Sequence, residues 1–155
     1  MDPGKEGDSG VTEQSQRLEA MIAALKQEGR RITPQRLAVL KILAHSQDHP
    51  SVEQIYQSVK QDFPTTSLAT IYKTVSLLKD LGEVLELAFS EWGNRYDGNR
   101  PYPHPHVICT KCGAISDPQF PPIDDMAREI AKLSGYSITH HRIDFFGLCP
   151  KCLGN

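Results

Sequence analysis

The stretch that decides the fold is residues 67–97, SLATIYKTVSLLKDLGEVLELAFSEWGNRYD. Its first half repeats apolar residues at helical spacing before a glycine at position 82, and these are Leu68, Ile71, Val75, Leu78 and Leu81. Its second half has two strand-like runs, residues 84–89 and 94–97, on either side of Glu91-Trp92-Gly93. This arrangement predicts a hairpin with a glycine-containing turn. A helix followed by such a hairpin is the outline of a winged helix-turn-helix.

Three shorter helices are predicted before residue 67. The first has an apolar face and ends at Gly29; its face consists of Leu18, Met21, Ile22 and Leu25. The second begins at Thr33-Pro34, an N-cap followed by proline at the first helical position, and the third follows Ser51. We therefore expect a winged-helix domain over residues 17–93, preceded by a polar, disordered tail over residues 1–16.

The second half of the chain has a different pattern. Three prolines fall within residues 100–105, which favours a stiff, extended hinge, and we place that hinge at residues 94–104. Strand-like runs at 107–108, 114–115 and 136–146 surround one helix at about 124–133. The fold class is therefore α+β, with a small second domain over residues 105–155.

Length and charge exclude several classes of protein. A chain of 155 residues is too short for a large multidomain enzyme, and a formal net charge of −2 gives no global positive field, so binding to DNA would need a local basic patch. No apolar run has the length of a membrane helix, and the N-terminus lacks the features of a signal peptide. We expect a cytoplasmic protein.

The cysteines form two CxxC pairs. Cys109-Thr110-Lys111-Cys112 and Cys149-Pro150-Lys151-Cys152 account for all 4 cysteines of the chain. Together they can supply the tetrahedral thiolate shell of a structural zinc ion. A thioredoxin-like redox pair is one alternative, but no βαβ pattern surrounds either motif. An iron–sulfur cluster is another, but its usual cysteine runs are spaced differently.

A second set of possible ligands lies nearby. His104 and His106 are two residues apart, so in an extended strand they point to the same face. Asp97 and Asp117 are the adjacent acids, and imidazoles mixed with carboxylates suit Fe(II), Mn(II) or Zn(II). An HxH pair by itself is weak evidence. A small metal-dependent enzyme is an alternative for this set, but no further acid/base or nucleophile cluster accompanies it, which favours a protein that is not an enzyme.

Several motifs together resemble one known family. They are residues 67–78 (SLATIYKTVSLL), 94–97 (NRYD), 104–113 (HPHVICTKCG) and 140–152 (HHRIDFFGLCPKC). In this order they resemble the ferric uptake regulator (Fur) family, over roughly residues 17–152. The resemblance implies a homodimeric bacterial repressor with an N-terminal winged helix and a C-terminal dimerisation domain. It also implies that metal occupancy sets the affinity for double-stranded operator DNA.

The resemblance also implies a regulatory site for Fe(II) or Mn(II). By position, its ligands are His49, Asp97, His104, His106 and Asp117. Aspartate at both carboxylate positions resembles the peroxide-stress repressors of the family, in which iron-catalysed oxidation modifies histidine ligands. The matching targets here are His49 and His104. The alternative within the family is an iron- or zinc-responsive repressor of metal uptake.

One further metal site of the family is incomplete in this chain. Two of its positions are occupied by Pro103 and Pro105, which offer no ligand. Asp124 and His141 are possible remnants of that site, but two ligands would not hold an ion tightly. We expect both to be ordinary surface residues.

The basic patch for DNA is small. Residues 25–80 contain eight lysines and arginines against five acids, so binding should need two subunits and should depend on salt. The helix from Ser67 to about residue 81 is expected to enter a major groove through Ala69, Tyr72, Lys73 and Ser76. Residues at its start, Thr65, Thr66 and Ser67, are expected to meet phosphates. By resemblance, Arg31 and Arg36 also approach the DNA backbone.

Overall fold

The computed structural model of the protein describes residues 9–89 and 91–154. The chain divides into two compact units between Pro101 and Tyr102. The predicted hinge, residues 94–104, therefore starts too early. Residues 94–97 belong to a strand of the first unit, because they pair with the strand that precedes them.

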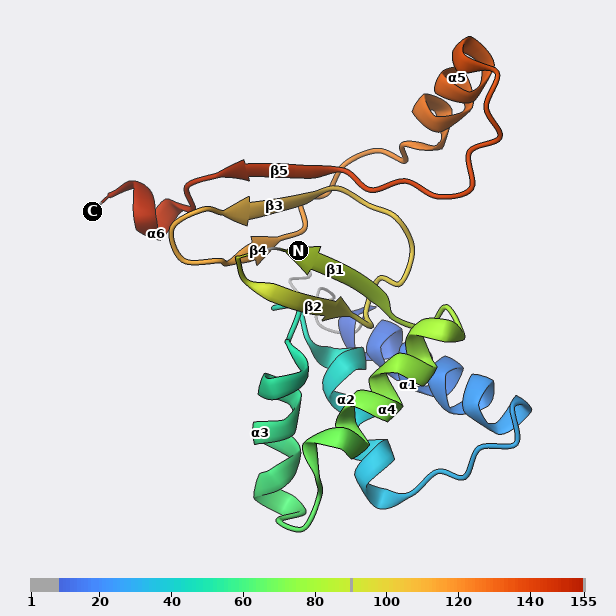
Figure 1. Ribbon diagram of the computed structural model, residues 1–155, viewed down its shortest axis with the longest axis vertical. Coiled ribbons are helices and arrows are strands. Elements are labelled where there is room, and N and C mark those ends of the chain that lie inside the picture. The colour runs from blue at the N-terminus through green and yellow to red at the C-terminus, as the bar shows by residue number, and fades with distance from the viewer. Residues whose placement is uncertain (1–8, 90, 155) are drawn as a thin grey trace, which may run out of the picture. The chain divides into compact units, whose positions relative to one another are not determined.

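The first unit contains four helices (Figure 1). They are α1 (Ser9–Gln27), α2 (Pro34–His45), α3 (Val52–Asp62) and α4 (Leu68–Asp80). The last three begin at the predicted residues, since the side chains of Thr33, Ser51 and Ser67 each accept a hydrogen bond from the backbone N–H three residues later. At α3 the side chain of Gln54 also binds the backbone N–H of Ser51, which completes a capping box.

Helix α1 begins eight residues earlier than predicted, at Ser9 instead of residue 17. The described part of the predicted tail is thus helical, and residues 1–8 lie outside the described residues. The first turns of α1 are mostly polar, and glutamine and glutamate support a helix without adding to its apolar stripe. Apolar periodicity therefore located only the packed end of this helix.

The hairpin of the first unit consists of β1 (Leu85–Phe89) and β2 (Gly93–Asp97), which pair antiparallel with Leu85 opposite Asp97. The core beneath it is formed by buried residues that include Met21, Leu40, Leu43, Ile55, Ile71, Leu78 and Tyr96. Leu68 differs from its prediction, because it lies in the first turn of α4 and is 37% exposed. Gly98 follows β2, where a Cβ atom would lie 2.8 Å from a side-chain atom of Leu43.

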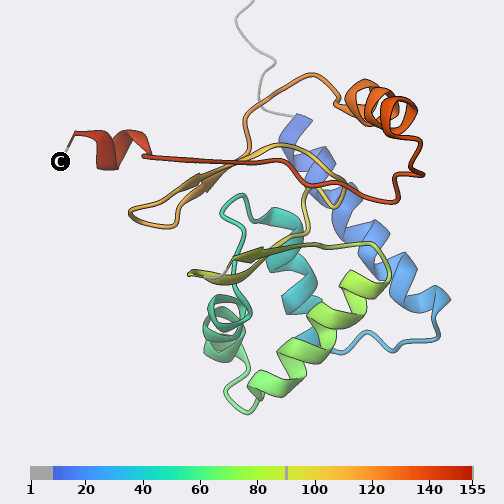
Figure 2. The ribbon, with the colours of Figure 1, turned by 45° about the horizontal axis from the view of Figure 1, so that its top comes forward.

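The second unit is a three-stranded sheet with the order β4-β3-β5. Its strands are β3 (His106–Cys109), β4 (Ile115–Ser116) and β5 (Asp144–Gly147), and its helices are α5 (Asp124–Ser134) and α6 (Pro150–Leu153). The two outer strands flank β3, with β4 antiparallel to it and β5 parallel to it (Figure 2). The strand predicted over 136–146 is shorter, because residues 136–143 have no strand partner among the described residues.

Helix α5 has an unburied apolar face. Met126, Ile130 and Leu133 lie on one side of it and are 50%, 50% and 80% exposed. Phe145 and Phe146 of β5 are also exposed, so the second unit presents a large amount of apolar surface. In the described part of the chain, no helix combines the length and hydropathy needed to cross a membrane.

Candidate metal centres

The four cysteines come together in the second unit. Their sulfur atoms all lie within 4.8 Å of one another, and none is in a disulfide. Cys109 and Cys112 stand at the end of β3, while Cys149 and Cys152 stand at the start of α6. The parallel pairing of β3 with β5 places Cys109 opposite Gly147, two residues before the second CxxC motif. The sheet register therefore brings the two motifs together.

The sulfur atoms are crowded in a way that favours a cation. Backbone N–H donors, that of Cys149 foremost, lower the pKa of the Cys109 thiol to about 6. Hydrogen bonds among the sulfurs, that of Cys149 foremost, raise the pKa of Cys152 to about 12. Four sulfurs at this spacing cannot all be thiolates without a neutralising ion. Their number and geometry fit a closed, structural zinc site.

The first unit contributes a buried histidine–carboxylate pair. His49 Nε2 lies 3.1 Å from Asp97 Oδ2, and the two side chains are 2% and 3% exposed. His49 lies in the loop before α3, and Asp97 is the last residue of β2. The other oxygen of Asp97, Oδ1, accepts hydrogen bonds from the backbone N–H groups of Asn99 (3.0 Å) and Arg100 (2.8 Å). Asp97 therefore offers one oxygen, Oδ2, toward His49.

The second unit contributes two histidines and a carboxylate. The rings of His104 and His106 have centroids 4.3 Å apart, as expected for an HxH pair on one face. Asp117 places Oδ2 at 3.1 Å from His104 Nε2 and Oδ1 at 3.6 Å from His106 Nε2. His104 Nδ1 lies 2.7 Å from the carbonyl oxygen of Tyr102, so it must donate a hydrogen there. In a neutral ring that ligates an ion, the lone pair of His104 would then be on Nε2, the atom that faces Asp117.

The distances within each unit suit donor atoms that share an ion. Two ligand atoms bound at about 2.1 Å to one ion and roughly 90–110° apart are separated by about 3.0–3.4 Å. The two separations of 3.1 Å agree with this range, and the separation of 3.6 Å is slightly wider. The chemistry of the donors, imidazole nitrogen and carboxylate oxygen, fits Fe(II), Mn(II) or Zn(II).

Two residues that the sequence analysis did not single out hold these histidines. Asp144 lies opposite His106 in the β3–β5 register, and its Oδ1 is 3.7 Å from His106 Nδ1. Arg142 Nε lies 2.6 Å from the other oxygen of Asp144. In the first unit, Arg95 donates to the carbonyl oxygens of Asp48 and His49. Arg95 precedes Asp97 by two residues in a predicted strand, which was a signal that both act on the same face.

The residues predicted to contact DNA from α4 are accessible to solvent. Its four expected groove residues, Ala69, Tyr72, Lys73 and Ser76, are all exposed, as are Thr65, Ser67 and Arg31. Tyr72 donates its hydroxyl hydrogen to Glu53 Oε1 at 2.9 Å, and Arg36 donates to the carbonyl oxygen of Arg31 at 2.6 Å. Thr66 differs from the prediction. It is 8% exposed, which makes its side chain unsuitable for contact with a phosphate.

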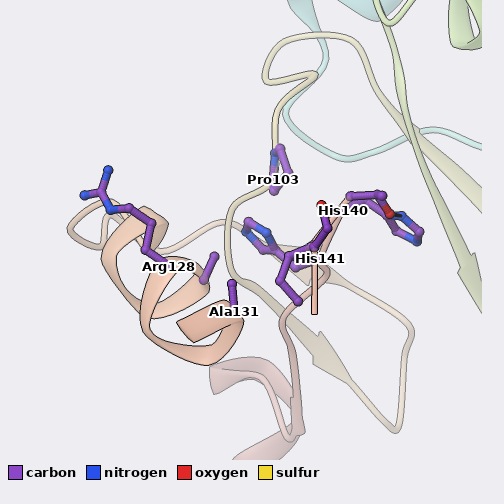
Figure 3. Close-up of a pocket in the computed structure, with 9 residues that line it drawn as sticks. Pro103, Arg128, Ala131, His140 and His141 are labelled. Atoms are coloured by element: carbon purple, nitrogen blue, oxygen red, sulfur yellow. Dashed lines mark hydrogen bonds between the residues drawn. The ribbon is translucent and has the colours of Figure 1, made fainter. Parts of the chain in front are cut away.

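A cavity of about 430 Å³ lies between α5 and the segment that precedes β5. It is lined by residues that include Pro103, Ala131 and His141, and Figure 3 shows Arg128 pointing away from His140 and His141. Asp124 is not among its lining residues. The cavity therefore does not bring Asp124 and His141 together as ligands of one ion.

Comparison with known families identifies the chain. The sequence model described as "Ferric uptake regulator family" matches residues 27–146. The chain belongs to the ferric uptake regulator family. Members of this family are transcriptional regulators, so the prediction that the protein is not an enzyme is confirmed.

Relatives within the family include peroxide-responsive repressors and ferric uptake regulators. The chain is 42% identical over 135 residues to the "Peroxide-responsive repressor PerR" of Staphylococcus aureus, covering 87% of this chain and 90% of that protein. Among solved structures, the ferric uptake regulator of Helicobacter pylori has a TM-score of 0.75 at 28% identity and covers 90% of this chain and 93% of its own. The Campylobacter jejuni peroxide stress regulator has a TM-score of 0.67 at 32% identity and covers 87% and 98%.

Proposed function

We propose that this protein is a homodimeric, metal-dependent repressor that releases its operator DNA when hydrogen peroxide oxidises a histidine ligand. The observation that carries the proposal is the pair of half-sites. His49 and Asp97 in the first unit have donor atoms spaced like ligands that share an ion, and so do His104, His106 and Asp117 in the second. The 42% identity to a peroxide-responsive repressor supports the choice of signal.

The charge of the five ligands suits a divalent metal. Two carboxylates neutralise the ion, and three imidazoles add nitrogen donors that favour Fe(II) and Mn(II) over the hard cations. Because two ligands belong to one unit and three to the other, an ion held by all five would fix the units in one arrangement. Such a fixed arrangement is what a dimer needs to present two α4 helices to two half-sites of an operator.

Peroxide acts through the histidines. Bound Fe(II) would supply the electron that cleaves the O–O bond of hydrogen peroxide. In the net reaction one oxygen atom is inserted into a ring C–H bond of His49 or His104, and the other leaves as water. An oxidised imidazole is a poorer nitrogen donor. The altered ligand then releases the ion, and the two units lose their common anchor.

Aspartate at position 97 favours this chemistry over a purely structural site. Asn99 and Arg100 occupy Oδ1 of Asp97 with two N–H donors, so this carboxylate is limited to one ligand atom. If each of the five side chains supplied one donor atom, an ion held by them would remain accessible to peroxide. A longer glutamate would not form the same turn with these two N–H groups.

The apolar surface of the second unit supports a dimer. The second unit exposes several large apolar side chains, namely Met126, Ile130, Leu133, Phe145 and Phe146, which is more apolar surface than is typical of a monomer. A second copy of the chain is the partner that closed symmetry favours. The same dimer doubles the small excess of positive charge within residues 25–80.

The test is operator binding by the zinc-loaded protein with Fe(II) or Mn(II), prepared without oxygen. The operator is a duplex selected from a random pool with the Mn(II) form, and binding is followed before and after micromolar peroxide. We expect only the Fe(II) form to dissociate, with one added oxygen on the peptide that contains His49 or His104. A His104→Ala variant should shift any modification to His49.

The alternative is a repressor that responds to metal supply. It is favoured by the 28% identity and high structural similarity to the Helicobacter pylori ferric uptake regulator. In that case both metal forms would stay bound and unmodified after peroxide. Binding would then depend only on the concentration of free metal.

A further inference from the structure

We propose that Arg95 is a positioning residue that holds the backbone of His49 in the conformation that aims its imidazole at the regulatory ion. The inference rests on the proposed site, because it assigns His49 as a ligand. It adds a residue that neither the ligand set nor the comparisons assign. Its mechanism is a clamp on the loop of residues 48–50.

The clamp binds three consecutive carbonyl groups. The guanidinium of Arg95 donates to the carbonyl oxygen of Asp48 at 2.8 Å, through Nη2, and to that of His49, through Nε. The backbone N–H of Tyr96 donates to the carbonyl oxygen of Pro50 at 3.0 Å. Two adjacent residues of β2 therefore fix every peptide unit around His49.

The backbone of His49 needs such support. Its φ angle is 51°, and among the described residues it is the only residue other than glycine with a positive φ. A β-carbon clashes with the backbone at positive φ, so residues other than glycine rarely adopt this region. Proline at position 50 restricts His49 further, because the residue before a proline prefers extended backbone. Strained backbone of this kind persists where surrounding contacts determine it and is concentrated at functional sites.

Strand β2 contacts both the backbone and the imidazole of His49. Residues 95 and 97 are two apart in β2, so their side chains leave the strand on one face. Arg95 binds the backbone of His49, while Asp97 Oδ2 lies 3.1 Å from its imidazole Nε2. The position of the imidazole relative to Asp97 is thus determined by one short piece of strand.

Arginine suits this task better than lysine. A planar guanidinium can donate to two neighbouring carbonyls with its Nε and Nη groups at once, whereas an ammonium is a single point donor on a flexible chain. Arg95 is half-buried, and its guanidinium donates to the carbonyl oxygens of Asp48 and His49. These hydrogen bonds keep its side chain against the loop of residues 48–50.

The experiment is a double-mutant cycle on the full-length, zinc-loaded protein. The variants are Arg95→Gln, His49→Ala and the combination of the two, with Arg95→Lys as the conservative change. Arg30→Gln, at an exposed arginine outside the clamp, is the matched control. The readouts are the Mn(II) dissociation constant and the visible absorption spectrum of the Co(II)-loaded protein, which reports the number of ligands.

If Arg95 acts through His49, Arg95→Gln should weaken Mn(II) binding by roughly 10–100-fold, the range found when residues that orient metal ligands are changed. Its Co(II) spectrum should resemble that of His49→Ala. In the His49→Ala background, Arg95→Gln should cause no further loss of Mn(II) affinity. The Mn(II) affinity of Arg95→Lys should lie between those of wild type and Arg95→Gln, and the affinity of Arg30→Gln should equal that of wild type.

If the losses of Mn(II) affinity in the two single variants add in the double variant, the inference is overturned, because Arg95 would then act through a residue other than His49. Unchanged Mn(II) binding in Arg95→Gln would overturn it as well. By contrast, wild-type binding in His49→Ala would refute the proposed regulatory site itself. If Arg95→Gln does not fold, judged by zinc content and thermal unfolding, the same cycle is run with Arg95→Lys.

A measurement on the protein without Mn(II) tests the hydrogen bonds of Arg95 independently of metal binding. A residue with positive φ gives a strong intraresidue nuclear Overhauser effect between its amide and α hydrogens. We expect this signal for His49 in the zinc-loaded protein without Mn(II), and we expect it to weaken in Arg95→Gln. A signal equally strong in both proteins would refute the clamp whatever the metal affinity.

Discussion

His104 illustrates how one hydrogen bond prepares a ligand. Its Nδ1 donates to the carbonyl oxygen of Tyr102, which in a neutral ring leaves the lone pair on Nε2, 3.1 Å from Asp117 Oδ2. Asp144 stands in a comparable position beside Nδ1 of His106, at 3.7 Å. For His104 the hydrogen bond to Tyr102 orients the ring, whereas Asp144 stands beyond hydrogen-bond distance and acts on His106 only through its charge.

At this scale we predict that Asp117→Glu keeps metal-dependent DNA binding but loses peroxide sensitivity. A longer side chain still supplies a carboxylate, but it moves the oxygen atoms relative to His104 and His106 and can occupy the position that peroxide needs. Operator binding before and after peroxide, with oxygen addition followed by mass analysis, measures the effect. Asp124→Glu on α5 is the control, and a variant as sensitive as wild type would argue against the role of Asp117.

The candidate ligand residues could be proposed from the sequence, because each carries its chemistry in its side chain and stands in a short motif. The contacts of Arg95 and Asp144 were not predictable, although the two-residue spacing of Arg95 and Asp97 in a predicted strand indicated a shared face. Their roles depend on the register of β2 and of the β3–β5 pair, and a parallel pairing between residues 38 positions apart leaves no local pattern in the sequence. The positive φ of His49 was also hidden, since the sequence Asp48-His49-Pro50 favours extended backbone before the proline.

Among the elements, the β1–β2 hairpin is tied to the first unit by Tyr96. This residue is 6% exposed, and its hydroxyl donates to Glu86 Oε1 at 3.1 Å across the hairpin. Burial, together with the charge of Glu86, raises the pKa of Tyr96 to about 12 from its ordinary value of 10.0. Its ionised form is thus strongly disfavoured in the folded state.

This shift predicts a specific alkaline loss of stability. A group whose pKa is higher in the folded state than in the unfolded state contributes fully to stability at any pH below its unfolded-state pKa. The contribution of Tyr96 is therefore intact below pH 10 and is lost as the pH rises toward 12. Chemical unfolding at several pH values should show wild type losing up to about 3 kcal/mol relative to Tyr96→Phe over this range. Tyr102→Phe, at an exposed tyrosine, is the control. Parallel pH profiles for wild type and Tyr96→Phe would contradict the prediction.

Element boundaries were predictable where a cap marks them. Thr33, Ser51 and Ser67 located the starts of α2, α3 and α4, because a side-chain oxygen at that position satisfies a backbone donor. The start of α1 and the short length of β5 were not predictable. A polar first turn has no apolar period, and an apolar alternation becomes a strand only where a neighbouring strand accepts its hydrogen bonds.

For the whole molecule, the zinc cluster and the dimer should depend on each other. We predict that Cys112→Ser loses zinc and dimerisation together, because three sulfurs no longer complete the shell that joins the ends of β3 and β5. Metal analysis and sedimentation equilibrium measure the two properties. Thr110→Ser, in the same CxxC motif, is the control, and a stable zinc-free dimer would refute the prediction.

The parallel pairing of β3 with β5 also has a kinetic consequence. The two strands are separated in sequence by α5 and its flanking segments, and contacts between such distant residues form slowly because a long loop must close first. A zinc ion held by the two CxxC motifs closes that same loop. Zinc supply would then set the rate at which the second unit matures, whereas the first unit, whose helices and hairpin are local in sequence, would fold without waiting for it.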